Sequence, residues 1–117
     1  MNNRRVGAEK EETAVAYLMN KGYIILKQNY RTTYGEIDII AKRDSMLVFC
    51  EIMYRSGNDY GDPLAAVDRR KQKRISRVAL YYYTEQGITE DTPCCFDVIG
   101  IYGDGTIRHI ENAFDFQ

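Results

Sequence analysis

Residues 35–54 read GEIDIIAKRDSMLVFCEIMY, and this stretch predicts two strands joined by a tight turn. Apolar and β-branched residues fill both halves, and the polar residues 42–45 interrupt them. A turn centred between Asp44 and Ser45 would pair residues whose numbers sum to 89 and would place Asp38 directly opposite Glu51, because opposite residues of a hairpin are fixed by its turn. The stretch therefore predicts a β-hairpin with one acid on each strand.

The two acids of this hairpin form a candidate metal site. Side chains directly opposite each other have Cβ atoms about 4.5–5.5 Å apart, and two carboxylates at that distance repel unless a cation lies between them. Mg²⁺ or Mn²⁺ would suit the pair, since these ions prefer oxygen ligands and retain waters for substrate phosphates. A metal held by Asp38 and Glu51 could promote phosphodiester cleavage. The other interpretation is that both acids lie at solvated strand ends.

The rest of the chain predicts a mixed α/β domain. The expected helices are residues 6–21 and 63–86, and the further strands are 23–26 (alternatively 23–30), 95–102 and 106–110. The second helix is expected to break near Asp68 and to stop at Gly87. Strands interrupted by a long helix suggest a mixed sheet with helices packed on it. No linker divides the chain, so residues 1–117 are expected to form a single domain.

Composition narrows the class of protein. The chain has 117 residues, 44% of them hydrophobic, and a net charge of −1, which is typical of a globular domain. No apolar run approaches the roughly 20 residues that span a membrane. The three cysteines are Cys50, Cys94 and Cys95, an odd count that argues against a disulfide framework and for a reducing cytoplasm. The single histidine, His109, is expected to be an ordinary strand residue.

Positive charge is concentrated in the second predicted helix. Residues 69–77 include six basic residues and no acid: Arg69, Arg70, Lys71, Lys73, Arg74 and Arg77. Arg70, Lys73, Arg74 and Arg77 share one helix face and could contact a phosphate backbone, with Arg55 joining them after the hairpin. The alternative is a solvated outer face. Of Tyr81, Tyr82 and Tyr83, one is expected to pack inward and two to lie at the rim.

Several short motifs together resemble one bacterial family. They are Gly7-xxx-Glu11-xx-Ala14-xx-Tyr17-Leu18, Gly22-Tyr23, Asn29-Tyr30-Arg31, Gly35-Glu36-Ile37-Asp38, Phe49-Cys50-Glu51, Tyr54-Arg55, Lys71-Gln72, Phe96-Asp97 and Asn112-Ala113-Phe114. On these motifs the chain is identified as resembling the YraN-like family, which is itself similar to Holliday-junction resolvases of the restriction-endonuclease-like superfamily. The resemblance covers nearly the whole chain.

This resemblance implies a restriction-endonuclease-like α/β fold, with an αβββαβ core and a mixed central sheet flanked by helices. It also implies a metal-dependent DNA nuclease that acts on branched DNA and can form a homodimer. By position, the superfamily's acids correspond to Asp38, Glu51 and Glu11, with Glu11 binding Mg²⁺ or Mn²⁺ directly or through water. The superfamily's lysine falls at Met53.

Methionine has neither a charge nor an N–H donor, so Met53 could not orient an attacking water. Three interpretations stay open. The protein has lost cleavage and kept binding, or Lys71 (less readily Lys73) supplies the missing cation, or Met53 is peculiar to this strain. The sequence therefore predicts a nucleic-acid-binding, nuclease-like protein with candidate catalytic residues Asp38, Glu51 and Lys71. The alternative is a non-catalytic DNA-binding, repair-accessory or protein-interaction module.

Overall fold

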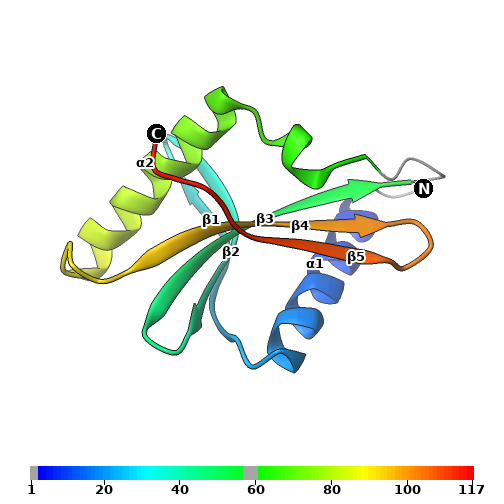
Figure 1. The fold of residues 1–117 in the computed structure, drawn as a ribbon, viewed down its shortest axis with the longest axis horizontal. Coiled ribbons are helices and arrows are strands. Elements are labelled where there is room, and N and C mark those ends of the chain that lie inside the picture. Colours follow the sequence, from blue (N-terminus) through cyan, green and yellow to red (C-terminus); the bar gives the residue numbers. More distant parts are fainter. Residues whose placement is uncertain (1–2, 57–60) are drawn as a thin grey trace.

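The computed structural model describes residues 3–56 and 61–117, and within them one five-stranded sheet is accompanied by three helical segments (Figure 1). The helices are α1 (Asn3–Asn20), the 3₁₀ helix η1 (Pro63–Ala66) and α2 (Arg69–Gln86). The strands are β1 (Ile24–Thr32), β2 (Gly35–Arg43), β3 (Met46–Arg55), β4 (Cys94–Tyr102) and β5 (Ile107–Phe114). The predicted order of elements is confirmed.

The strands lie in the order β1-β2-β3-β4-β5. Each neighbouring pair is antiparallel except β3 and β4, which are parallel and are connected through α2. A parallel pair needs such a crossover, because a tight turn cannot join two strands that run the same way. The helices α1 and α2 cover opposite faces of the sheet (Figure 1). The predicted mixed sheet flanked by helices is therefore confirmed.

Two apolar cores lie on the two faces of this sheet. The core under α2 includes Ile37, Ile40, Phe49, Val67, Ile75, Val78, Tyr82 and Phe96. The core under α1 includes Ala14, Leu18, Ile39, Ala41, Val48, Cys50 and Ile99. Because successive strand residues point to opposite faces, the central strands β3 and β4 contribute to both cores. The two sets of contacts fix both helices against one sheet.

Local capping explains where α2 begins and ends. The Asp68 side chain accepts a hydrogen bond from the backbone N–H of Lys71 at 2.8 Å, which satisfies one of the free donors of the first turn. Gly87 adopts a left-handed conformation at φ 64° and closes the helix. The expected break and stop are both confirmed. One expectation is wrong: Tyr82 and Tyr83 are both buried, because the Tyr83 hydroxyl reaches Thr92 O at 2.7 Å.

All three cysteines carry free thiols. Burial raises the pKa of Cys50, and burial with the nearby charge of Asp97 raises the pKa of Cys95 to about 12. Both side chains are therefore neutral thiols at neutral pH, which excludes them as activated nucleophiles. Among the described helices, none is long and apolar enough to cross a membrane.

Candidate functional site

The hairpin has the register that its sequence predicts. Ile40 pairs with Phe49, and the ladder ends one pair further along, at Ile39 and Cys50. Beyond that point the Asp38 side chain replaces the ladder, because its Oδ2 accepts a hydrogen bond from the backbone N–H of Ile52 at 2.8 Å. The two strands therefore begin to part where the two acids lie, and a side chain tethers them.

Glu51 is buried in this fork, with only 4% of its surface exposed, so the interpretation of a solvated strand end is wrong for this residue. Its Oε1 meets no hydrogen-bond donor within the described ranges. Burial, together with the negative charge of Asp38, raises the pKa of Glu51 to about 8, and Lys71 opposes the shift. A proton therefore remains on Glu51 at neutral pH when no metal ion is bound.

Asp38 shares this environment. Burial raises the pKa of its carboxyl, while the hydrogen bond from Ile52 opposes the shift. The two carboxyl groups lie close enough for the negative charge of Asp38 to raise the pKa of Glu51. Two neighbouring buried acids of this kind are a site where a cation can replace the proton on Glu51.

Lys71 extends to this pair from the first turn of α2. Its Nζ lies 3.6 Å from Oε2 of Glu51, and its side chain is 38% exposed. The Asp68 cap holds the Lys71 backbone, so the start of the helix positions the ammonium. The structure thus brings together Asp38, Glu51 and Lys71, the three residues predicted as catalytic.

Met53 lies at the position for which the family resemblance implies a lysine. It lies two residues after Glu51 on β3, hence on the same face of the strand, and is 8% exposed. Its partner on β4 is Gly100, and a Cβ at Gly100 would come within 2.7 Å of Pro63 Cγ in η1. Glycine is therefore needed for η1 to approach the sheet beside Met53. This contact fixes the segment that leads into α2.

Glu11 lies on α1 and binds a different partner. Its Oε1 accepts a hydrogen bond from Nδ2 of Asn29 at 2.7 Å. Asn29 has a positive φ of 52°. It lies on β1 opposite Asp38 of β2, because its two neighbours in the chain pair with Ile39 and Ile37. Glu11 is thus hydrogen-bonded to Asn29 on β1, next to the strand that carries Asp38. Its role as a metal ligand stays a prediction.

The donor set fits a hard cation that keeps several waters. Within the part of the chain that the structure describes, no group of three or more acid, histidine or cysteine side chains is arranged around one metal position. Two carboxylates are nevertheless enough for Mg²⁺, which is commonly held by one or two carboxylates together with waters and substrate phosphates. The Oε1 of Glu51, which meets no donor among the described residues, and the nearby charge of Asp38 are the observations that favour such an ion.

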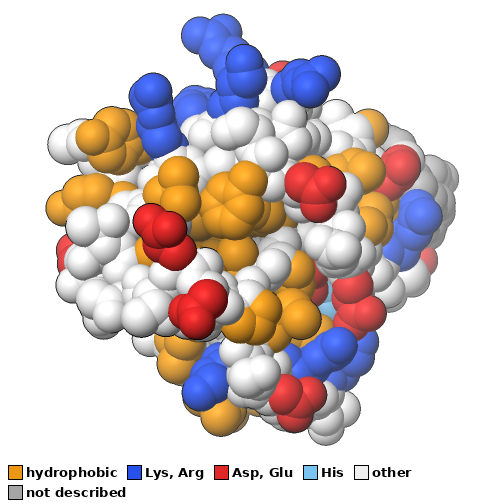
Figure 2. Space-filling model, turned by 60° about the vertical axis from the view of Figure 1, so that its left-hand side comes forward, with side chains coloured by type: hydrophobic (Ala, Val, Ile, Leu, Met, Phe, Trp, Pro, Cys, Tyr) orange, Lys and Arg blue, Asp and Glu red, His pale blue; other side chains and the backbone are white. Residues whose placement is uncertain are grey.

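The predicted phosphate-binding residues of α2 form an exposed stripe, consisting of Arg70, Lys73, Arg74 and Arg77. Figure 2 shows Lys and Arg side chains gathered along the top of the molecule, where Figure 1 places the first half of α2. Arg55 lies apart at the end of β3, where it is half-buried. The stripe begins one residue before Lys71 on the same helix.

Comparison with known proteins now places the chain. Residues 10–101 match the uncharacterised protein family UPF0102. The chain belongs to this family. A UPF0102 protein of Lachnoclostridium phytofermentans is 44% identical over 115 residues, which covers 98% of this chain and 97% of the relative. UPF0102 proteins of Clostridioides difficile and Coxiella burnetii are 44% and 37% identical, and each match covers 97% of this chain and at least 95% of the relative. The resemblance to the YraN-like family is thereby confirmed.

This UPF0102 chain also contains a buried polar network that the sequence did not predict. His109 Nε2 lies 2.6 Å from Asp97 Oδ2, and the two side chains are 4% and 1% exposed. His109 Nδ1 lies 3.0 Å from the hydroxyl of Tyr17 on α1. Asp97 Oδ1 accepts from the backbone N–H of Asn112 at 2.9 Å. His109 is therefore not an ordinary strand residue, because it connects α1 to β4.

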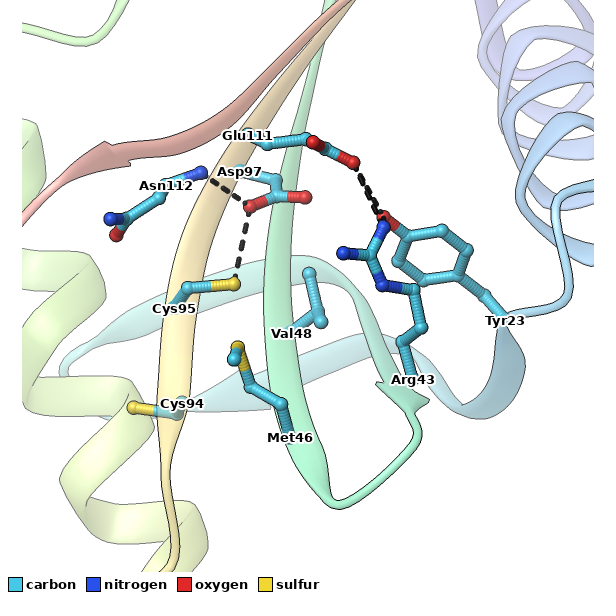
Figure 3. A pocket seen from close by; sticks show the side chains of 9 residues that line it. All are labelled: Tyr23, Arg43, Met46, Val48, Cys94, Cys95, Asp97, Glu111 and Asn112. Atoms are coloured by element: carbon cyan, nitrogen blue, oxygen red, sulfur yellow. Dashed lines mark hydrogen bonds and ion pairs between the residues drawn. The ribbon is translucent and has the colours of Figure 1, made fainter.

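Beside this network lies a cavity of about 260 Å³ (Figure 3). Asp97, Cys95 and Asn112 line one side, and Arg43 and Tyr23 lie across from them. Arg43 donates to Glu111 at 3.0 Å and to the Tyr23 hydroxyl at 3.0 Å. The charged groups at this cavity, Asp97, Arg43 and Glu111, thus have partners within the UPF0102 chain. One sequence signal could have revealed the network, namely an acid, Asp97, in the middle of the apolar strand CCFDVIGIY.

Proposed function

We propose that this protein binds nucleic acid and hydrolyses phosphodiesters with the help of a divalent metal ion at Asp38 and Glu51. The observation that carries the proposal is the 3.6 Å approach of Lys71 Nζ to Oε2 of the buried Glu51, next to Asp38. The Lys71 ammonium provides the positive charge that a methionine at position 53 cannot provide. Of the three interpretations of Met53, this geometry favours Lys71 as the substitute.

Each residue has a separate part in this proposal. Asp38 and Glu51 would hold Mg²⁺ or Mn²⁺, and a bound metal of this kind polarises a phosphoryl oxygen and makes bound water more acidic. The ammonium of Lys71 would orient the attacking water or offset charge that develops on the phosphate. Such an aimed group is commonly worth about 10²–10³ in rate. The hydrogen bond from Ile52 keeps the Asp38 carboxylate in place.

The basic stripe of α2 supports nucleic acid as the partner. Clustered Arg and Lys side chains neutralise phosphates and release counterions, and Arg70, Lys73, Arg74 and Arg77 are all exposed. The stripe starts beside Lys71 on the same helix. A backbone bound to it would therefore be delivered to the acid pair. Branched DNA, as the resemblance implies, is the first substrate to test.

A second candidate function is a non-catalytic nucleic-acid-binding module. The observation that favours it is Met53, an uncharged side chain that is 8% exposed on the same face as Glu51. In that case the carboxyl pair would be an inherited remnant, while the stripe on α2 would still bind phosphates. The two candidates agree on binding and differ on cleavage.

A cleavage assay separates the two candidates. The native protein, Asp38→Asn, Lys71→Met and Met53→Lys would be incubated with linear, single-stranded and branched DNA in Mg²⁺, Mn²⁺ or EDTA. We expect metal-dependent cleavage by the native protein and none by Asp38→Asn. Lys71→Met should cut about 10²–10³ times more slowly, whereas Lys27→Met, at an exposed lysine of β1, should cut at the native rate.

The double variant Lys71→Met with Met53→Lys sharpens this test, because position 53 shares the face of Glu51. We expect it to regain part of the lost rate. If Lys71→Met cuts as fast as the native protein, the role given to Lys71 is wrong. If no variant cuts but all bind DNA, the second candidate function is correct. If none binds DNA at low salt, both candidates are wrong.

A further inference from the structure

Two exposed tyrosines lie at the far end of the basic stripe. Tyr81 of α2 is 44% exposed, and Tyr34, in the turn between β1 and β2, is 45% exposed. Their ring centroids are 6.2 Å apart at an interplanar angle of 59°. The rings are therefore neighbours that do not stack flat on each other, and both side chains remain exposed to solvent.

This pair continues the stripe of positive charge. The guanidinium carbon of Arg77 lies 5.5 Å from the centroid of the Tyr34 ring. Together with Leu80 and Thr84, the three side chains line a shallow hollow of about 370 Å³. Arg77 also lines the adjoining hollow of about 420 Å³, which it shares with Arg70, Lys73 and Arg74. An aromatic platform and a phosphate-binding surface thus meet at one arginine.

The platform is held in place by backbone contacts. The backbone N–H of Tyr34 donates to Oγ1 of Thr32 at 3.0 Å, and that hydroxyl donates to Gly35 O at 3.2 Å, which closes the turn. A Cβ at Gly35 would lie 3.6 Å from Val78 Cγ2, so the turn rests directly on α2. Because the turn is docked on the helix, the two rings are pre-positioned before any ligand arrives.

We propose that Tyr34 and Tyr81, with Arg77, form a subsite that stacks an unpaired base of a nucleic acid whose phosphates lie along the α2 stripe. This inference rests on the proposed nucleic-acid binding and makes the ligand more specific, since a fully paired duplex offers no free base. Stacking on exposed aromatic side chains accepts any base. Arg77 provides the adjacent positive charge.

The spacing places the subsite within reach of the acid pair. Ten residues separate Lys71 from Tyr81 on α2, which is about 15 Å along the helix axis. At about 3.4 Å per nucleotide in a stacked strand this spans roughly four nucleotides, and fewer where the strand is unstacked. The substrate is therefore a strand with an unpaired segment a few nucleotides from the phosphate beside Lys71.

The test uses a DNA duplex with a single-stranded arm that carries 2-aminopurine at successive positions, in EDTA so that no cleavage occurs. Fluorescence reports stacking of the base, and anisotropy reports affinity. The variants are Tyr34→Leu, Tyr81→Leu and Arg74→Gln. Tyr54→Leu is the matched control, because Tyr54 is similarly exposed (38%) and its ring lies 3.2 Å from Lys10 Nζ of α1, on the other face of the sheet.

We expect the native protein to change the fluorescence at one arm position or two neighbouring ones. Tyr34→Leu and Tyr81→Leu should each abolish this change and weaken binding at least about fivefold, with an unaltered slope of affinity against salt. Arg74→Gln should keep the fluorescence change and reduce the slope by about 0.7, the value for one phosphate contact on a single strand. Tyr54→Leu should match the native protein.

An abasic nucleotide at the responsive position gives a further control. It should weaken binding by the native protein about as much as Tyr81→Leu does, and should not weaken Tyr81→Leu further. If the duplex without an arm binds as tightly as the armed one and the tyrosine variants bind normally, the stacking subsite is wrong while the proposed binding stands. If no form of the protein binds DNA even at low salt, the proposed function and this inference both fail.

Discussion

The Oδ2 atom of Asp38 accepts a hydrogen bond from the backbone N–H of Ile52 at 2.8 Å, just beyond the last ladder pair of the hairpin. The Asp38 side chain thus replaces a backbone hydrogen bond of the ladder at the point where β2 and β3 separate. The same carboxyl adjoins Glu51, whose pKa it helps to raise. Replacing Asp38 by Asn should keep an oxygen acceptor for Ile52 and remove the charge, which separates structure from chemistry.

Divalent cation binding should depend steeply on pH. A metal must displace the proton of Glu51, whose pKa is raised from 4.5 to about 8. Affinity for Mg²⁺ or Mn²⁺ should therefore rise by up to about tenfold per pH unit toward pH 8 and level off above it. Calorimetric titration at pH 6, 7 and 8 measures this. Asp38→Asn should lose binding and Glu12→Gln, an exposed acid of α1, should not. Equal affinity at pH 6 and pH 8 would contradict the expectation.

Glu51 should also make the metal-free protein less stable as pH rises. The folded protein keeps a proton on Glu51 between about pH 4.5 and pH 8, whereas the unfolded chain has released it. The stability that comes from this bound proton is fully present below pH 4.5 and is lost as pH rises toward 8. The free energy of unfolding should fall by at most about 1.4 kcal/mol per pH unit. Glu51→Gln should flatten the fall, as measured by urea unfolding across that range. A slope identical to that of the native protein would show that the Glu51 carboxyl is ionised in the fold.

Gly100 should be needed to position Lys71. A methyl group there would overlap Pro63 Cγ at 2.7 Å, so Gly100→Ala should cost about 1–3 kcal/mol of stability and displace η1, which leads into α2. Metal affinity and any cleavage should fall with it. Gly22→Ala is the control, since Gly22 has a positive φ of 93° and nothing near its Cβ. It should destabilise the fold through backbone strain alone. Similar effects of both variants on the site would contradict the positioning role.

Much of the fold could be predicted from local chemistry. The register of the hairpin follows from its polar turn and the two-residue alternation, and Asp68 and Gly87 mark the ends of α2 by their capping chemistry. These signals lie within a few residues of the features that they determine. The candidate acids Asp38 and Glu51 could be found for the same reason.

The contacts between distant segments could not be predicted. Whether Lys71 reaches Glu51 depends on how η1 packs on Gly100, and no local pattern encodes that packing. The bond between Tyr17 and His109 joins residues 92 positions apart. A lone histidine in a strand gives no sign of such a partner. Helical spacing alone also failed to predict the burial of Tyr83, whose hydroxyl donates a hydrogen bond to the carbonyl of Thr92 beyond the end of α2.

The buried Asp97–His109 pair should stabilise the fold without serving the acid site. Asp97→Ala would leave Nε2 of His109 and the N–H of Asn112 without their partner, and each buried polar group left unpaired typically costs about 1–3 kcal/mol. Tyr17→Phe, which removes only the hydroxyl at Nδ1 of His109, should cost about 0.5–1.5 kcal/mol. Urea unfolding of both variants, of His109→Leu and of the double variant Asp97→Ala with His109→Leu measures these costs and the coupling between the two residues.

Because the network lies on the α1 face, Tyr17→Phe should bind DNA and metal as the native protein does. A loss of either activity in Tyr17→Phe, at full folding, would instead assign this network to the function of the protein.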